Sequence, residues 1–274
     1  MPNLVNSIAV PGLVDRIANS LSDLAILALT ALAFGLVGGL VALLSNLLWF
    51  RRWPQHSAYE DKLGDAAHTS MLGFSAFVLA LLITNGLTSL SSAEQATRSE
   101  ATAVYRLGRE LDALGFVAHA PKQALVDYTK NVANDELPRL ARLPNSLSPL
   151  AQQNLDDLWI GVRSVQRSMA VTDPARNDIG AYVTRIETLR GGRLSAAISN
   201  IPGDFWLILL LFVIAASFLS GRERPKSFGM QINVIQMSAI GLAVGLVVCL
   251  NNPFRGETRI GPDIIESALA PQAL

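Results

Sequence analysis

The sequence predicts an all-α membrane protein, with four transmembrane helices and an antiparallel four-helix bundle inserted between spans two and three. Of its 274 residues, 50% are hydrophobic and only 16% are charged, and the mean hydropathy is +0.35. Soluble domains carry about 25% charged residues, so this composition indicates a membrane protein. No stretch of useful length alternates apolar and polar residues with period two, so we expect no strands.

Four runs without Asp, Glu, Lys or Arg provide the predicted spans, because a transmembrane helix needs about 20 predominantly apolar residues. They are Leu24–Phe50, Thr69–Ala93, Phe205–Gly221 and Ile232–Leu250. The domains that follow are an N-terminal amphipathic tail at 1–23, spans one and two within 24–93, an extramembrane helical bundle at 94–203, spans three and four within 204–254, and a C-terminal tail at 255–274.

Four segments of the insert carry apolar residues at three- and four-residue spacing, the period of an amphipathic helix. The stripes are Val104-Leu107-Leu111-Leu114, Leu125-Tyr128-Val132, Leu155-Leu158-Val162-Val165-Met169 and Ile179-Tyr182-Ile186-Leu189. Helix starts are expected at Pro121, Ser148-Pro149 and Asp173-Pro174, because Ser caps helices and Pro suits their first position. Breaks near 115–121, 143–148 and 171–174 leave short connections, which favour an antiparallel bundle.

The basic residues of the short loops predict the orientation, because such loops keep Lys and Arg in the cytoplasm. The two hairpin loops carry Arg51, Arg52 and Lys62, and Arg222, Arg224 and Lys226, whereas the tail before Leu24 has only Arg16. We expect a multi-pass protein of the cell (inner) membrane whose termini and helical insert are extracytoplasmic. Arg255 and Arg259 after span four weaken this contrast.

Composition and motifs exclude several classes of function. The 22 basic and 22 acidic residues give a net charge of zero, so no nucleic-acid partner is expected. The sequence contains no nucleophile elbow, phosphate loop or dinucleotide fingerprint, which predicts no catalytic residue, no enzyme activity and no cofactor. Cys249 is the only cysteine and the three histidines lack ligand spacing, so no metal site is expected either.

Small and polar residues inside the spans each allow two interpretations. Gly35, Gly38 and Gly39 either let helices approach closely or form a pore wall or hinge. Uncharged polar residues of span two either form interhelical hydrogen bonds or line a pore near its outer mouth. These residues are Thr84, Asn85, Thr88, Ser89 and Ser92. Beyond them, Arg98 and Arg106 favour anions at that mouth, whereas Glu94 opposes them.

The stretch "LNNPFRGETRIGP" (250–262) follows the last span. Pro253 ends the helix, Phe254 is expected to anchor at the membrane interface, and Gly256 allows a tight turn that returns the tail toward the bundle. Arg255 then lies at the headgroup level or at a pore mouth. The stretch serves either as a structural cap or in ion selectivity.

This ending resembles that of bestrophin-like membrane proteins, in which Leu-Asp-x-Pro-Phe-x-Gly and a later Pro are typical. "EATAVYRLGREL" (100–111) is similar to that family's helix leaving span two, and "GRLSAAISNIPGDFW" (192–206) to its entry into span three. The matching residues include Glu100, Tyr128, Glu136, Arg193, Pro202 and Trp206. Asn251 stands where the family usually has Asp, and Leu137 where it usually has Trp. An ion or partner site that needs that Asp would be altered here.

The resemblance implies a relation to bestrophin anion channels. The leading hypothesis is a homo-oligomeric ion channel or channel-like pore, with the lipid bilayer and inorganic ions as partners, because four helices leave little room for a pore within one chain. The alternative is a membrane sensor or scaffold whose outer bundle binds a ligand or partner. An enzyme is the weakest of the three hypotheses.

Overall fold

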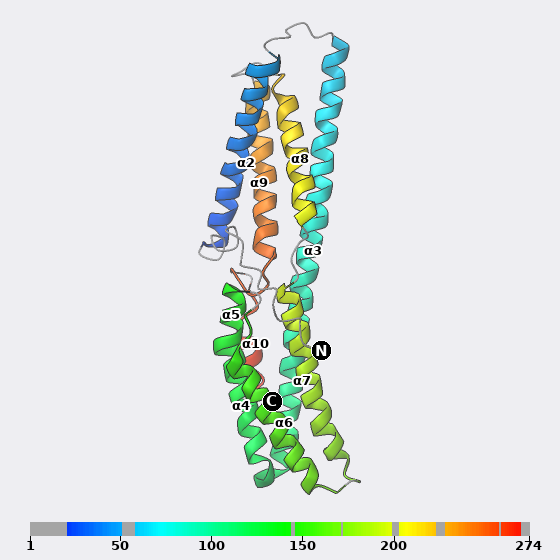
Figure 1. Ribbon diagram of the computed structural model, residues 1–274, viewed down its shortest axis with the longest axis vertical. Coiled ribbons are helices and arrows are strands. Elements are labelled where there is room, and N and C mark those ends of the chain that lie inside the picture. Colours follow the sequence, from blue (N-terminus) through cyan, green and yellow to red (C-terminus); the bar gives the residue numbers. More distant parts are fainter. Residues whose placement is uncertain are drawn as a thin grey trace, which may run out of the picture. The chain divides into compact units, whose positions relative to one another are not determined.

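The computed structural model describes residues 21–50, 58–143, 146–170, 172–198, 203–222, 228–257 and 259–269. Over these ranges every regular element is a helix (Figure 1), which confirms the predicted all-α class. The chain divides into two compact units. The apolar unit comprises 20–88 and 200–251, and the bundle unit comprises 1–19, 89–199 and 252–274.

Four helices form the apolar unit: α2 (Asp23–Ser45), the first part of α3 (Ala58–Ala113), α8 (Gly203–Ser220) and α9 (Phe228–Leu250). The five-residue π-helix η1 (Asn46–Phe50) follows α2. Within the described ranges, three segments are long and apolar enough to cross a membrane, Asp23–Leu48, Lys62–Ala113 and Phe228–Leu250, and Asp204–Ser220 is a shorter apolar helix. The protein is therefore a membrane protein. Its second predicted span is one part of a single helix of 56 residues.

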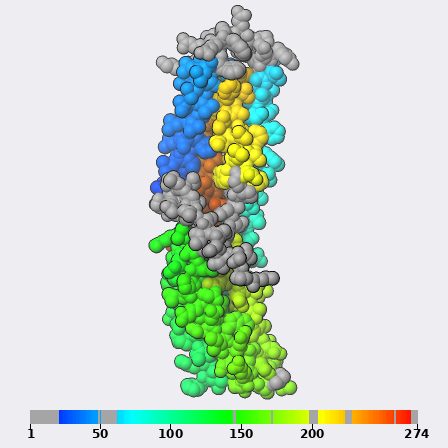
Figure 2. All heavy atoms as spheres, in the orientation of Figure 1, coloured from blue at the N-terminus to red at the C-terminus, as the bar shows by residue number. Residues whose placement is uncertain are grey.

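Helices α2, α8 and α9 lie side by side in the apolar unit, and α9 is visible between the other two in the space-filling view (Figures 1 and 2). Glycines allow the close approach of α2 and α9. A Cβ at Gly35 would stand 2.3 Å from Ser238 Oγ, and one at Gly241 would stand 2.5 Å from the carbonyl oxygen of Thr30. The helix-packing interpretation of the glycines in the first span is confirmed.

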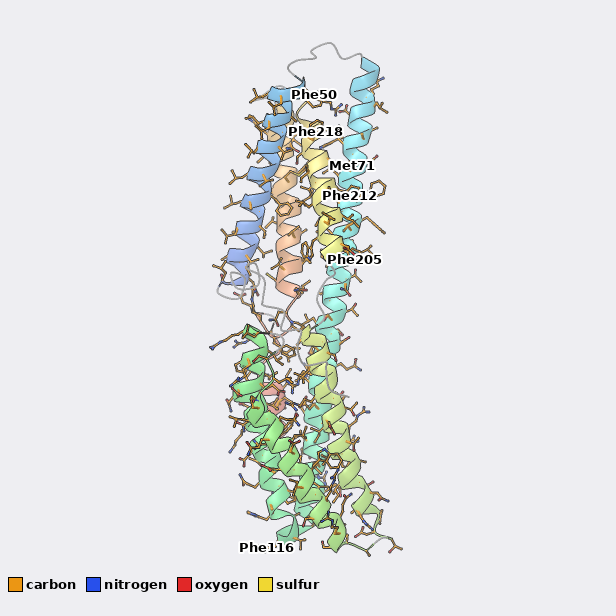
Figure 3. The ribbon with its side chains drawn as sticks, viewed as in Figure 1. Phe50, Met71, Phe116, Phe205, Phe212 and Phe218 are labelled. Carbon is orange, nitrogen blue, oxygen red and sulfur yellow. The ribbon has the colours of Figure 1, made fainter. Side chains whose placement is uncertain are left out.

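Apolar side chains from α3, α8 and α9 form the core of this unit. Its buried members include Leu79, Leu82, Leu209, Val213, Met237 and Val247. Phe74 of α3 stacks on Phe212 of α8 with ring centroids 5.4 Å apart. The ring of Phe50 packs against that of Phe218 (Figure 3), with centroids 5.7 Å apart. Ser45 and Asn46 join α2 and η1 to α8, because they donate to the carbonyls of Phe218 at 2.9 Å and Gly221 at 2.7 Å.

A chain of polar groups also connects all four helices of the apolar unit. The Asn233 amide of α9 donates to the carbonyl of Gly38 in α2 at 3.3 Å, so its oxygen accepts from the Ser220 hydroxyl of α8 at 2.9 Å. The same hydroxyl lies 2.9 Å from Nε2 of His68 in α3. The Ser220 hydroxyl also lies 3.2 Å from the carbonyl oxygen of Ala216 in its own helix.

The bundle unit contains the rest of α3, η2 (Gly115–Ala118), α4 (His119–Asn131), η3 (Val132–Glu136), α5 (Leu137–Arg142), α6 (Pro149–Ser168), α7 (Pro174–Ile198) and the short α10 (Asp263–Glu266). Helix α4 packs on α6, and α6 on α7. All four predicted apolar stripes contribute to one core. The helix periodicity of the insert is confirmed.

Most predicted helix boundaries in the insert agree with the structure. Ser148 accepts a hydrogen bond from the Ala151 amide at 3.1 Å, and Asp173 accepts one from Ala175 at 3.0 Å, as caps of α6 and α7. Gly115, just after the end of α3, has a φ of 65°, which interrupts the helical course of the backbone. Helix α4 begins at His119, two residues before the predicted start at Pro121. The π-helix η3 and the short α5 were not predicted. The N-terminal tail to residue 20, Arg51, Arg52, Pro202, Arg224 and Lys226 lie outside the described residues.

Candidate functional site

One side of α3 presents a row of uncharged polar side chains. Thr84, Thr88, Ser91, Gln95 and Thr102 are all exposed. At about 100° per residue they fall within about 60° of one another around the helix axis. We call this row the polar face of α3. Asn85 and Ser92 are exposed beside it, whereas Ser89 is half-buried and donates to the carbonyl of Ala196 in α7 at 3.4 Å. Ser89 therefore does not share the polar face.

Asn85 differs from the threonines in its hydrogen bonding. The hydroxyls of Thr84 and Thr88 donate to carbonyls of their own helix, those of Ala80 at 2.8 Å and Thr84 at 2.9 Å. Among the described residues, no group bonds to the Asn85 side chain. An amide within an apolar helix needs water or another protein group, because lipid tails offer neither donor nor acceptor.

Charge appears on the polar face only beyond Ser92. Arg98 donates from Nε and Nη2 to one oxygen of Glu94, at 2.9 and 2.7 Å, as an i,i+4 pair whose side chains are 64% and 43% exposed. The two residues also border a surface hollow of about 560 Å³ in the bundle unit. Residues 257 and 259–264 of the C-terminal segment line its other side, with Ser267. No group of three or more His, Cys, Asp or Glu side chains in the described ranges is arranged to hold a metal ion.

A buried ion network lies in the core of the bundle unit. Arg193 of α7 donates from Nε to Glu100 at 2.9 Å and from Nη2 to Glu136 at 2.7 Å. Arg190, one turn earlier, donates from Nη2 to the other oxygen of Glu136 at 2.6 Å. The Tyr128 hydroxyl donates to Glu100 at 2.6 Å. Two arginines and two glutamates thus cancel in charge and come from α3, η3 and α7.

The network fixes the protonation of its members. Burial, followed by the charge of Glu100, raises the pKa of Tyr128 well above 10.0, so the phenol stays protonated and remains a donor. Burial raises the pKa of Glu136, but the hydrogen bond from Arg190 and the charge of Arg193 outweigh it and hold the pKa below the ordinary 4.5. Glu136 thus remains an acceptor for both arginines near neutral pH.

Four network residues, Glu100, Tyr128, Glu136 and Arg193, are those on which the family resemblance was recognised. The structure brings them together although they are up to 93 residues apart. Arg190 and its partner Gln152, 2.5 Å from Nη1, were missed. A signal was present, because Ile186, Arg190 and Arg193 continue the buried spacing of α7. A charge inside an apolar stripe indicates a buried ion pair.

The stretch after α9 is a structural connection within the bundle unit. The Asn252 amide donates to the carbonyls of Leu140 at 3.3 Å and Ala141 at 3.1 Å, which are free ends of the α5 hydrogen-bond ladder. Gly256 has φ of 83°, as its predicted tight turn requires. Phe254 is 2% exposed in the core of the bundle unit, so its predicted position at the membrane interface is wrong. The core attracts it because burial of an aromatic ring is strongly favourable.

Four other residues lie at positions on which the family resemblance was judged. Pro253 lies just beyond α9, which ends at Leu250, and its carbonyl accepts from the Ile260 amide at 3.1 Å. Arg255 is half-buried, and its amide bonds back to the Asn252 carbonyl at 3.2 Å. Asn251 stands where the family usually has Asp, and its side-chain oxygen is buried without a hydrogen-bond partner among the described residues. Leu137, at the usual Trp position, is buried in the core.

Comparison with known proteins agrees with this geometry. The bestrophin-like domain matches residues 38–265. No curated protein sequence matches the chain. A crystal structure of a bacterial bestrophin homologue from Klebsiella pneumoniae is similar with a TM-score of 0.64 at 13% identity, covering 89% of this chain and 95% of that one. A crystal structure of a membrane protein with a single substitution is similar with a TM-score of 0.66 at 12% identity. The match covers 87% of this chain and 95% of that one. At such identities the structures show a shared fold, and the domain match shows the family. The chain belongs to the bestrophin-like family of membrane proteins.

Proposed function

We propose that this chain is one subunit of a homo-oligomeric ion channel in which the polar face of α3, together with Asn85 and Ser92 beside it, lines the conducting path. The observation that carries the proposal is Asn85, an exposed amide in an apolar helix with no partner among the described residues. The threonines at 84 and 88 lie beside it. Water in a pore, or a second subunit, satisfies such a side chain, whereas lipid does not.

Several copies are needed to enclose this path. The four apolar helices pack on a core of their own side chains, and α3 turns its polar face away from that core. A pore surrounded by one copy of α3 from each subunit gives ions a lining of hydroxyl and amide groups. Such groups replace part of an ion's hydration without binding it strongly, which suits passive permeation.

The finer topology is part of the same proposal. All four apolar helices, the shorter α8 included, cross the membrane, and the bundle unit is extracytoplasmic. Lys62 and Arg222 lie in or beside the two predicted cytoplasmic loops. A cysteine in place of Ser146, in a Cys249→Ser background, is expected to react with an impermeant thiol reagent in whole cells. Labelling only after lysis would reverse the orientation.

Conductance of the purified protein in liposomes, with ion replacement, tests the channel directly. Asn85→Leu removes the amide and is expected to reduce or alter conductance while the oligomer stays intact. Ala76→Leu is the matched control, because it adds the same side chain at an exposed position of α3 about 180° away.

These measurements distinguish a role of Asn85 in the pore from a role in packing between subunits. If Asn85 instead forms an intersubunit hydrogen bond, Asn85→Leu weakens the oligomer by about 0.6–2 kcal/mol. Mass measurement in mild detergent and in nanodiscs detects that loss. Unchanged conductance and selectivity in an intact Asn85→Leu oligomer would remove this amide from the pore, and a wild-type monomer would contradict the channel.

The alternative function, a membrane sensor or scaffold, has one observation in its favour. The hollow of about 560 Å³ beside the C-terminal segment is bordered by both acidic and basic side chains, namely Glu94, Arg98, Glu257, Arg259 and Asp263. A site of mixed charge suits a polar or zwitterionic ligand. Absence of conductance in liposomes, with an intact oligomer, would favour this alternative.

A further inference from the structure

Three arginines, Arg98, Arg106 and Arg109, are exposed on α3 at and beyond the polar face. At about 100° per residue they lie within about 80° of one another and of Thr102. A chain of positive charges therefore continues the row of uncharged polar groups. Their surroundings differ, and the difference determines which of them act on a passing ion.

Arg98 is neutralised by its own helix. Two of its nitrogens donate to the same Glu94 oxygen at 2.9 and 2.7 Å. The pair carries no net charge, so at distances larger than its own size it has little influence on an ion. Between residues 69 and 105 of α3, the other charged side chain is Glu100, which is buried in the ion network.

Arg106 and Arg109 are not neutralised in this way. Neither forms an ion pair within 4.0 Å with any described residue. The acids nearest in sequence are Glu110 and Asp112. Asp112 is bonded to Lys122, and Glu110 pairs with neither arginine. Residues three apart on a helix are neighbours at about 5–6 Å, well within a Debye length of about 8–10 Å, so their fields add.

We infer that Arg106 and Arg109 give the path along α3 its preference for anions, and that Glu94 neutralises the charge of Arg98. This inference rests on the proposed pore. Each subunit contributes two uncompensated positive charges, and symmetric copies repeat them around the axis. Such a ring concentrates anions and repels cations at the end of the path, which affects permeability without a tight binding site.

Reversal potentials across liposomes in a potassium chloride gradient test the assignment. The wild-type protein is expected to favour chloride over potassium. Arg106→Gln with Arg109→Gln is expected to lower the chloride-to-potassium permeability ratio about fivefold, the factor that corresponds to one unit-charge interaction at ~4 Å in water. Each single substitution is expected to give about half of that logarithmic change, and provides the answer if the double variant does not assemble.

The matched control is Glu94→Gln with Arg98→Gln. It also removes two charged side chains from α3, but leaves the net charge unchanged, so its permeability ratio is expected to stay within about twofold of wild type. Glu94→Gln alone releases Arg98 and is expected to raise the ratio. Lower ionic strength is expected to enlarge every shift.

Failure of the channel proposal can be distinguished from failure of this inference about selectivity. A wild-type oligomer that does not conduct overturns the channel proposal, and this inference with it. A wild-type protein that conducts, with an unchanged ratio in the Arg106 and Arg109 variants, overturns the inference and leaves the channel standing. A shift in the charge-neutral control as large as that of the double arginine variant also overturns it.

Discussion

Replacement of Arg193 by methionine tests whether the buried network holds the bundle unit together. Methionine carries no charge and donates no hydrogen bond. The substitution removes hydrogen bonds to Glu100 at 2.9 and 3.3 Å and one to Glu136 at 2.7 Å. Glu136 retains Arg190 as a partner, but the fully buried Glu100 retains, among the described residues, only the Tyr128 hydroxyl.

The expected loss of stability is large, because a carboxylate remains buried without its cation. Removal of one partner of a buried ion pair costs about 3–5 kcal/mol. With about 2–4 °C per kcal/mol for a domain of this size, the unfolding midpoint is expected to fall by about 6–20 °C. The measurement is thermal unfolding in detergent, followed by tryptophan fluorescence.

Two further variants make the test specific. Arg98→Met removes an exposed i,i+4 pair with Glu94, for which about 0.3–0.5 kcal/mol is expected. Glu100→Gln in the Arg193→Met background neutralises the isolated carboxylate and is expected to recover part of the loss. If Arg193→Met lowers the midpoint no more than Arg98→Met, the network does not stabilise the fold.

Two other predictions concern the bundle unit. The pKa of Glu136 lies below 4.5 in the folded protein, so its contribution to stability is present above about pH 4.5 and is lost as the pH falls through the folded pKa. A pH series of unfolding midpoints is expected to show a decline there, less steep in Glu136→Gln; identical curves would refute the assignment. Asn252→Asp cannot donate to the carbonyls of Leu140 and Ala141 and places a charge beside them. We expect a loss of about 1–3 kcal/mol, measured in the same way, with Asn134→Asp, an exposed position, as control. Equal midpoints for these two variants would contradict the capping role of Asn252.

Most helices of this protein could be predicted from its sequence. Runs without charge reveal apolar helices, and three- and four-residue spacing reveals amphipathic ones, because both patterns are local along the chain. The N-caps at Ser148 and Asp173 were predictable for the same reason, since each cap bonds two or three residues ahead. The glycines of the first span also indicated close packing, although not which helix they approach.

Local patterns in the sequence do not predict which distant residues meet. Glu100 and Arg193 appear in the sequence as two separate motif residues, and nothing local states that one guanidinium satisfies two carboxylates. Phe254 follows an apolar span and suggested an interfacial anchor, yet the bundle core buries it. Periodicity specifies which side of a helix is buried, whereas partners are chosen by packing between helices, which is not local in sequence.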